Sequence, residues 1–198
     1  MWCERIKRWW GVFGLLLMLA FFSRFQGFGA AIMIFCASLI HECGHLLILW
    51  WGGGSIRRFR TSAEGMEICA DSLRMSYPGE ILAVLAGPVI NLIAGWILIQ
   101  ISAFYPTLRL AAGANFVLGL FNLLPAPPLD GWRILQLFAE WGLGPGRGAG
   151  IAALGIFVSF LLAAGLTLLV LVSGGDLWLL PTAAALLTAG ISTAYREL

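Results

Sequence analysis

Six apolar segments divide the chain and constrain its fold more than any other feature. They run over approximately residues 9–22, 28–51, 80–104, 108–124, 151–173 and 177–194. A helix needs about 20 apolar residues to cross a bilayer, and three of the segments reach or approach that length. Because 60% of the residues are hydrophobic and only 11% are charged, the chain has more apolar side chains than the core of a soluble domain could bury. We therefore expect an all-α polytopic membrane protein with about six transmembrane helices.

The polar stretches between these segments are short. Residues 52–79 form the only sizeable one, and within it residues 55–61 and 66–69 are short runs that flank Ala63-Glu64-Gly65. Such runs predict a small β-hairpin in the loop after the second helix. Glycine alternates with other residues over 142–150, which favours a flexible loop. Without an internal repeat or an appended soluble domain, we expect a single membrane-embedded domain over residues 1–198.

The basic residues predict the orientation of the helices. With six spans and both termini on one side, that side carries ten of the twelve basic residues, and the other carries Arg24 and Arg109. An excess of Lys and Arg is typical of the cytoplasmic side, so both termini should be cytoplasmic, in a membrane that we expect to be the bacterial cytoplasmic membrane. The short segment 9–22 lacks a small-residue cleavage site, which favours a retained helix. A net charge of +2 is too small to indicate a nucleic-acid partner.

The chain has only two histidines, and both lie in His41-Glu42-Cys43-Gly44-His45, inside the second apolar segment. On a helix, residues four apart share one face, so both imidazoles can reach one metal ion. Glu42 is placed to take a proton from a water molecule that zinc has made acidic. An ionised side chain at a helix centre costs about 2.5–3.5 kcal/mol in a membrane. A metal site therefore explains the cluster better than His–Glu pairing between helices does.

A third ligand is expected for one catalytic zinc ion, because such an ion usually has three protein ligands and one open position. Since no third histidine exists, the ligand is a carboxylate or a thiolate, and Asp130 is the strongest candidate. Asp130 follows three prolines in four residues, which cannot continue a helix. Non-helical backbone at membrane depth is tolerated where protein buries it or where it lines a wet cavity. Cys43 is a poorer candidate because it points away from the histidine face.

These residues resemble the site-2 protease family of intramembrane zinc metalloproteases. The resemblance rests on His41 to His45 and on the segment from Asn122 to Gly131. It implies that His41, His45 and Asp130 bind zinc, that Glu42 is the general base, and that membrane-protein substrates are hydrolysed in regulated intramembrane proteolysis. The absence of a PDZ or CBS domain makes the chain similar to short bacterial members, including the sporulation FB type. Trp132 stands where the family often has a second glycine.

A further stretch, Ala86-Gly87-Pro88-Val89-Ile90-Asn91, resembles the family's G-P-x-x-N-like sequence. Four small or polar residues recur at every fourth position here, and such a stripe permits close approach of helices: Ala83, Gly87, Asn91 and Gly95. The resemblance implies that Asn91 or Asn122 donates a hydrogen bond to the substrate carbonyl or its oxyanion. Packing alone, with Asn91 as a polar contact between helices, remains an alternative.

Two other functions are compatible with a polytopic membrane chain. A catalytically silent scaffold of the same fold would have lost a ligand or the base, whereas all four residues are present. A metal transporter would need polar residues along a path through several helices, whereas this chain has one compact cluster. The expected partners are the lipid bilayer and membrane-protein substrates, and the sequence does not identify a regulatory partner.

Overall fold

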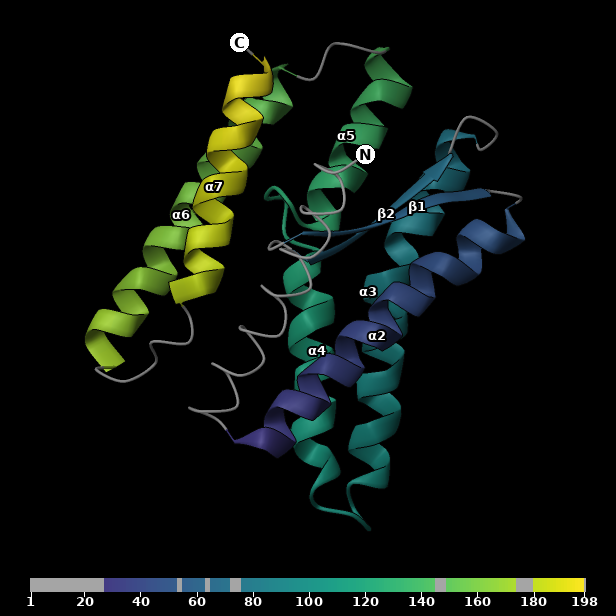
Figure 1. Cartoon of the computed structure of the whole chain (residues 1–198), viewed down its shortest axis with the longest axis vertical. Helices are drawn as coiled ribbons and strands as arrows, with labels where there is room; N and C mark the ends of the chain where they lie inside the picture. The colour runs from purple at the N-terminus through teal and green to yellow at the C-terminus, as the bar shows by residue number, and fades with distance from the viewer. Residues whose placement is uncertain are drawn as a thin grey trace, which may run out of the picture. The chain divides into compact units, whose positions relative to one another are not determined.

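The computed structural model describes residues 27–52, 55–62, 65–71, 76–144, 149–173 and 180–197. The first predicted apolar segment, 9–22, lies outside these ranges. The chain divides into two compact units, Met1–Gly119 and Leu120–Leu198, which are taken in turn. Helices dominate the described residues of both units, as the sequence predicts for a membrane chain (Figure 1).

Two long helices form the centre of the first unit. Helix α2 spans Phe28–Trp51, which are the predicted bounds, and it follows Gly27, whose φ of +89° a side chain would disfavour. Helix α3 spans Tyr77–Ile101, so it begins and ends three residues before the predicted 80–104. The earlier start is explained by Pro78 in the first turn, where a missing N–H costs no hydrogen bond.

Helices α2 and α3 pack against each other along small residues (Figure 1). A Cβ placed at Gly44 would lie 2.6 Å from the carbonyl oxygen of Ala86 and 2.7 Å from Cγ2 of Ile90. Ala83, Gly87, Asn91 and Gly95, the predicted stripe, are all buried. The close approach of helices that the stripe predicts is therefore found, and Gly44 contributes the facing small residue on α2.

Helix α4 spans Leu108–Asn122 and follows a tight turn after α3. It ends two residues before the predicted boundary at 124, because the prolines that begin at Pro125 cannot continue a helix. A Cβ at Gly95 would lie 3.1 Å from the ring of Phe116, and one at Gly119 would lie 3.0 Å from the carbonyl oxygen of Pro88. The small residues of α3 thus also bring α4 close.

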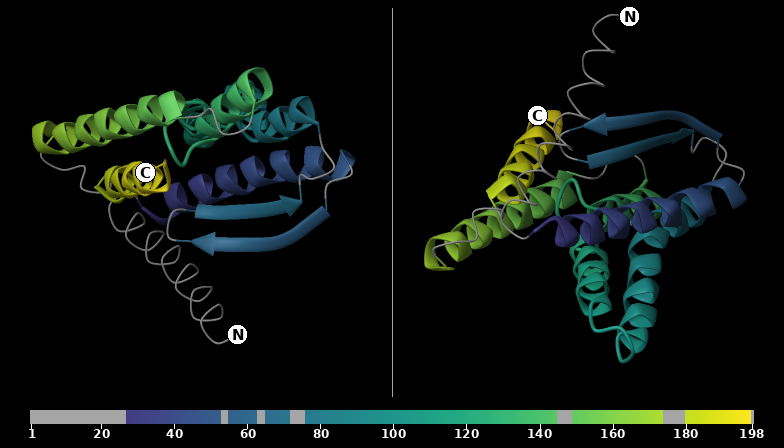
Figure 2. Two further views of the ribbon diagram at one scale, coloured as in Figure 1. Left: turned by 90° about the horizontal axis from the view of Figure 1, so that it is seen from above. Right: turned by 60° about the horizontal axis from the view of Figure 1, so that its bottom comes forward.

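Along the chain, α2 is followed by two antiparallel strands, β1 over Ser55–Ser62 and β2 over Gly65–Asp71, and then by α3 (Figure 2). Ser62 pairs with Gly65 next to the turn, and Ser55 pairs with Asp71 at the far end. The register shifts between Ile56 and Arg58. These strands make up the two-stranded sheet of the described residues.

The second unit contains one helix that the apolar segments did not predict. Helix α5 spans Asp130–Leu143 and begins directly after residues 123–129, the proline segment, which contains the three prolines. Arg133, Gln136 and Glu140 recur at helical spacing, and this amphipathic pattern predicts a helix where a search for long apolar runs finds none. The helix ends at Gly144, whose φ is +88° and whose N–H donates to the carbonyl of Glu140.

Helices α6, over Ala149–Ser173, and α7, over Leu180–Glu197, lie side by side in the second unit (Figures 1 and 2). The predicted loop over 142–150 was wrong at both ends, because α5 and α6 extend into it. The core of this unit is formed by small and branched residues of the proline segment and of both helices: Ala126, Ala163, Ala183 and Leu186. Small residues again allow close packing where lipid provides no hydrophobic drive between helices.

Among the described residues, three helical stretches are long and apolar enough to cross a membrane: Phe28–Trp51, Tyr77–Ile101 and Ala153–Val172. Two shorter apolar stretches, Leu108–Asn122 and Thr182–Ala194, correspond to the fourth and sixth predicted segments. Large apolar side chains on these helices are exposed rather than packed, for example Trp96, Val117 and Leu171. Such surfaces are suited to lipid, so the fold fits an integral membrane protein.

Candidate metal centre

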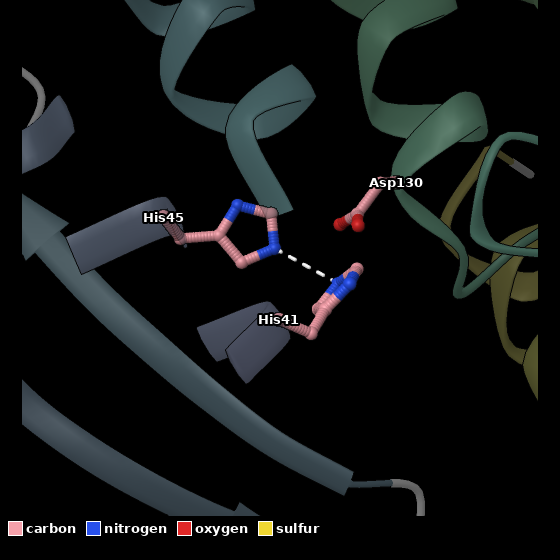
Figure 3. Close-up of side chains that lie close together, drawn as sticks. All are labelled: His41, His45 and Asp130. Atoms are coloured by element: carbon pink, nitrogen blue, oxygen red, sulfur yellow. Dashed lines mark hydrogen bonds between the residues drawn. The ribbon is translucent and has the colours of Figure 1, made fainter. Parts of the chain in front are cut away.

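The two histidines of α2 face each other across one helical turn (Figure 3). Their Nε2 atoms are 3.1 Å apart, and the ring planes meet edge to face at 82°. An ion with Zn–N bonds of about 2.0–2.1 Å in tetrahedral geometry separates two such nitrogens by roughly 3.3 Å. The helical spacing therefore produces the predicted pair of converging imidazoles, at a separation that fits two ligands of one ion.

A main-chain carbonyl orients one of these rings. Nδ1 of His45 lies 2.9 Å from the carbonyl oxygen of Ala83 on α3, to which its N–H donates. With the proton on Nδ1, the lone pair of a neutral imidazole is on Nε2, the atom directed at His41. Metal-ligating histidines commonly have such a partner, which fixes both the tautomer and the ring orientation. Ala83 thus gives the site a supporting contact that sequence reasoning did not identify.

Gly87 of α3 provides the space for both rings. A Cβ placed there would collide with the His45 ring and would lie 2.9 Å from Nε2 of His41. The spacing of Ala83 and Gly87 predicted a packing stripe, but it did not predict that these two positions would face the histidines. His41 is buried at 6% exposure and His45 is half-buried, so surrounding side chains shield the pair.

The other predicted site residues occupy distinct positions in the two units. Glu42 is half-buried on α2, next to His41, and Cys43 is exposed. Asn91 is fully buried on α3, one turn beyond Gly87. In the second unit, Asn122 is the last residue of α4 and Asp130 is the first of α5. Asn122 and Asp130 therefore bracket the proline segment.

The donor set fits a zinc ion in its chemistry. His41 and His45 each offer one imidazole nitrogen, and Asp130 of the second unit offers a carboxylate oxygen. Zinc binds nitrogen and carboxylate oxygen of this kind, and catalytic sites with two histidines and one carboxylate leave a position for water. The described residues hold no other group of potential ligands of this size.

The fold is that of a site-2 protease. The solved structure of the site-2 protease from Methanocaldococcus jannaschii superposes with a TM-score of 0.68, covering 93% of this chain and 87% of that one at 23% identity. No family model matches the chain. The comparison of folds agrees with the resemblance that the motifs indicated.

The sequence of the chain is similar to those of zinc metalloproteases. The chain is 32% identical to the zinc metalloprotease MJ0392 of Methanocaldococcus jannaschii over 129 residues, which are 62% of this chain and 38% of that protein. It is 32% identical to the candidate zinc metalloprotease Rip3 of Mycobacterium tuberculosis over 174 residues, 75% of this chain and 41% of Rip3. The chain thus spans about two fifths of the length of these relatives. The similarity to site-2-type zinc metalloproteases is confirmed.

Proposed function

We propose that this chain is an intramembrane zinc metalloprotease that hydrolyses peptide bonds of membrane-associated proteins. The observation that carries the proposal is the His41–His45 pair, with Nε2 atoms 3.1 Å apart, in an apolar helix. Its relatives bear the name zinc metalloprotease, and its fold is the site-2 protease fold. The whole chain, residues 1–198, would act as one metalloprotease domain.

His41, His45 and Asp130 would hold the ion, a single catalytic zinc. The donor types support this assignment, as does the position of Asp130 at the end of a proline segment that cannot be helical. When bound, zinc polarises a peptide carbonyl and makes water acidic enough to attack it near neutral pH. The imidazoles would bind in their neutral form, with His45 held as the Nδ1–H tautomer by Ala83.

Glu42 would act as the general base. Its carboxylate is half-buried one residue from His41, where it can accept a proton from the attacking water. As the C–N bond of the peptide breaks, the same carboxyl group returns the proton to the leaving nitrogen. Asn91 or Asn122 would donate an amide N–H to the carbonyl oxygen as negative charge develops on it.

The chain would cross the membrane six times, with both termini in the cytoplasm of a bacterial cell. Helices α2, α3 and α6 have 24, 25 and 25 residues, which suffices for a full span. With 15 residues, α4 is about 22 Å long and shorter than a bilayer core of about 30 Å, so it would require local thinning. The β1–β2 hairpin would then lie on the cytoplasmic side, the side with most of the arginines.

The substitution Glu42→Gln tests the mechanism. Removal of a general base lowers turnover by about 10²–10⁴-fold, while the three zinc ligands remain in place. We expect cleavage of a membrane-protein substrate in detergent micelles to fall by that factor, with zinc content unchanged as measured by atomic absorption. Glu140→Gln on α5 is the matched control and should cleave normally.

Unchanged cleavage by the Glu42→Gln variant would eliminate this mechanism. If the wild-type chain binds zinc but produces no peptide product from any membrane substrate, the silent scaffold is favoured. Zinc flux into proteoliposomes without peptide product would favour a transporter. Among the described residues one potential ligand group is found, whereas a transport path needs several.

A further inference from the structure

A buried hydroxyl group on α6 holds the backbone of the proline segment. Ser159 is 0% exposed, and its Oγ donates a hydrogen bond of 3.2 Å to the carbonyl oxygen of Pro127, 32 residues earlier in the chain. Backbone that is not helical at membrane depth must find partners for its polar groups, since lipid offers none. Ser159 provides one for a segment in which prolines have removed the regular helical pattern.

A second contact of α6 holds the chain on the other side of Asp130. A Cβ placed at Gly155 would lie 2.5 Å from Cε3 of Trp132, so the indole rests directly on this glycine. Trp132 is buried at 6% exposure. Gly155 and Ser159 are four residues apart and therefore share one face of α6. One turn of α6 thus contacts the chain three residues before Asp130 and two residues after it.

The start of α5 has little freedom of its own. A Cβ at Gly131 would lie 2.6 Å from the carbonyl oxygen of Leu124, which shows how tightly the chain folds back before the helix begins. The N–H groups of Leu129 and Trp132 donate to the carbonyls of Ala126 and Leu129. The turn that carries Asp130 is therefore a compact unit that its neighbours can orient as a whole.

Helix α7 packs closely against the Ser159 side chain. A Cβ at Gly190 would lie 3.2 Å from Cβ of Ser159, so α7 approaches α6 closely at this turn. Ala126 of the proline segment packs with Ala163, Ala183 and Leu186 in the core of the same unit. The serine side chain consequently lies between the proline segment and α7, in a packed environment that limits its rotamers.

We infer that Ser159 is a positioning residue for Asp130. By binding the Pro127 carbonyl, and together with the Gly155–Trp132 contact, it fixes the turn from which the Asp130 carboxylate projects. This inference rests on the proposed function, because it gives Asp130 the role of a zinc ligand. Since the hydroxyl donates to the Pro127 carbonyl, its effect would be on how well the carboxylate is oriented.

The test is the zinc affinity of the Ser159→Ala variant of the full-length chain, measured in detergent by competition with a chelator of known affinity. Loss of a contact that orients a metal ligand typically weakens metal binding by about 10–100-fold. We expect zinc affinity to fall by at least about tenfold. Cleavage should fall at limiting zinc and recover at saturating zinc. The Ser159→Cys variant keeps the size of the side chain and a weak hydrogen-bond donor, so its zinc affinity should lie between those of the wild type and of Ser159→Ala. It also tests the inference if the alanine variant fails to fold.

The matched control is Thr167→Val, two turns further along α6. The Thr167 hydroxyl donates to the carbonyl of Ala163 within its own helix, at 2.8 Å, rather than to the proline segment. This variant should bind zinc as the wild type does. A control that weakens zinc binding as much as Ser159→Ala would show a general effect of α6 stability and would overturn the inference.

Asp130→Asn separates the inference from the proposed function. If Asp130→Asn weakens zinc binding while Ser159→Ala leaves it within about twofold, Asp130 is a ligand and the positioning role of Ser159 is refuted. If Asp130→Asn leaves zinc binding unchanged, the ligand assignment is wrong, and the role of Ser159 falls with it. If both variants bind zinc weakly and Thr167→Val does not, the inference is supported.

Discussion

Asn91 has a buried polar side chain whose contacts do not explain its role. It is 0% exposed on α3, and neither its Nδ2 nor its Oδ1 has a hydrogen-bond partner among the described residues. Burial of an amide that makes no hydrogen bond costs about 1–3 kcal/mol. A role in binding the substrate carbonyl gives a reason for keeping that amide one turn from Gly87.

The substitution Asn91→Leu distinguishes catalysis from packing. If Asn91 donates to the developing oxyanion, as proposed, kcat should fall by about 10²–10³-fold in this variant. Zinc content should stay constant, and the midpoint of thermal unfolding in micelles should be equal or higher. A variant that is more stable and turns over normally would leave Asn91 with a packing role only.

Asn115→Leu is the matched control for that experiment. Asn115 is also buried, at 2% exposure, but it lies on α4 and its Nδ2 donates to the carbonyl of Ala111 in the same helix. Its replacement should leave kcat unchanged. Equal losses in both variants would indicate that any change in the polarity of these helices impairs turnover.

At the scale of helices, the approach of α3 to α2 decides the geometry of the histidine pair. Gly87 contacts both imidazoles, and the carbonyl of Ala83, one turn earlier, orients the second. The stripe therefore has two functions on one helix face, since it allows close packing and also places a hydrogen-bond acceptor. A side chain at position 87 would separate the helices and tilt the rings.

Gly87→Ala should consequently weaken zinc binding. The added methyl group meets the rings of both histidines. If these are the zinc ligands, as proposed, we expect at least about a tenfold loss of zinc affinity, comparable to the loss of an orienting contact. Chelator competition measures the loss. Gly113→Ala on α4 is the control, because a Cβ there meets nothing within 4 Å, and alanine should stabilise that helix by about 0.5–1 kcal/mol. Wild-type zinc affinity in the Gly87→Ala variant would contradict this account of the site.

The sequence predicted the elements whose signal is local and missed those whose signal depends on other elements. His41 and His45 converge because helical spacing alone sets their relation. Helix α5 was missed because its pattern is amphipathic rather than apolar, and Gly142 and Gly144 suggested a loop. The contacts of Ala83 and Ser159 could not be predicted, because each depends on which helix packs opposite. The ligand role of Asp130 remains a proposal.

At the scale of the whole molecule, the distribution of charge predicts which turns face the cytoplasm. The turn between α3 and α4, residues 102–107, has no basic residue, and Arg109 is the second residue of α4. The loop between α2 and α3 contains four arginines. An excess of positive charge retains a loop in the cytoplasm, so these two connections should lie on opposite sides of the membrane.

Reporter fusions in a bacterial host check this topology. Alkaline phosphatase, which is active only outside the cytoplasm, should be active when it is fused after Pro106. It should be inactive when it is fused after residue 72 or at the C-terminus. Activity after residue 72 would reverse the predicted orientation, and activity at the C-terminus would mean that the number of spans after α4 is odd.

The contact between His45 and the Ala83 carbonyl has a consequence for how the chain can vary. A peptide oxygen carries no proton that titrates near neutral pH, so acid cannot switch this support off as it would an aspartate in the same place. No exchange of one side chain for another removes the oxygen, because every amino acid supplies it. Mutation around His45 can therefore disturb its imidazole only by bending α3 or by crowding the ring. The feature that must be kept is the course of the main chain at residue 83, and not the identity of that residue.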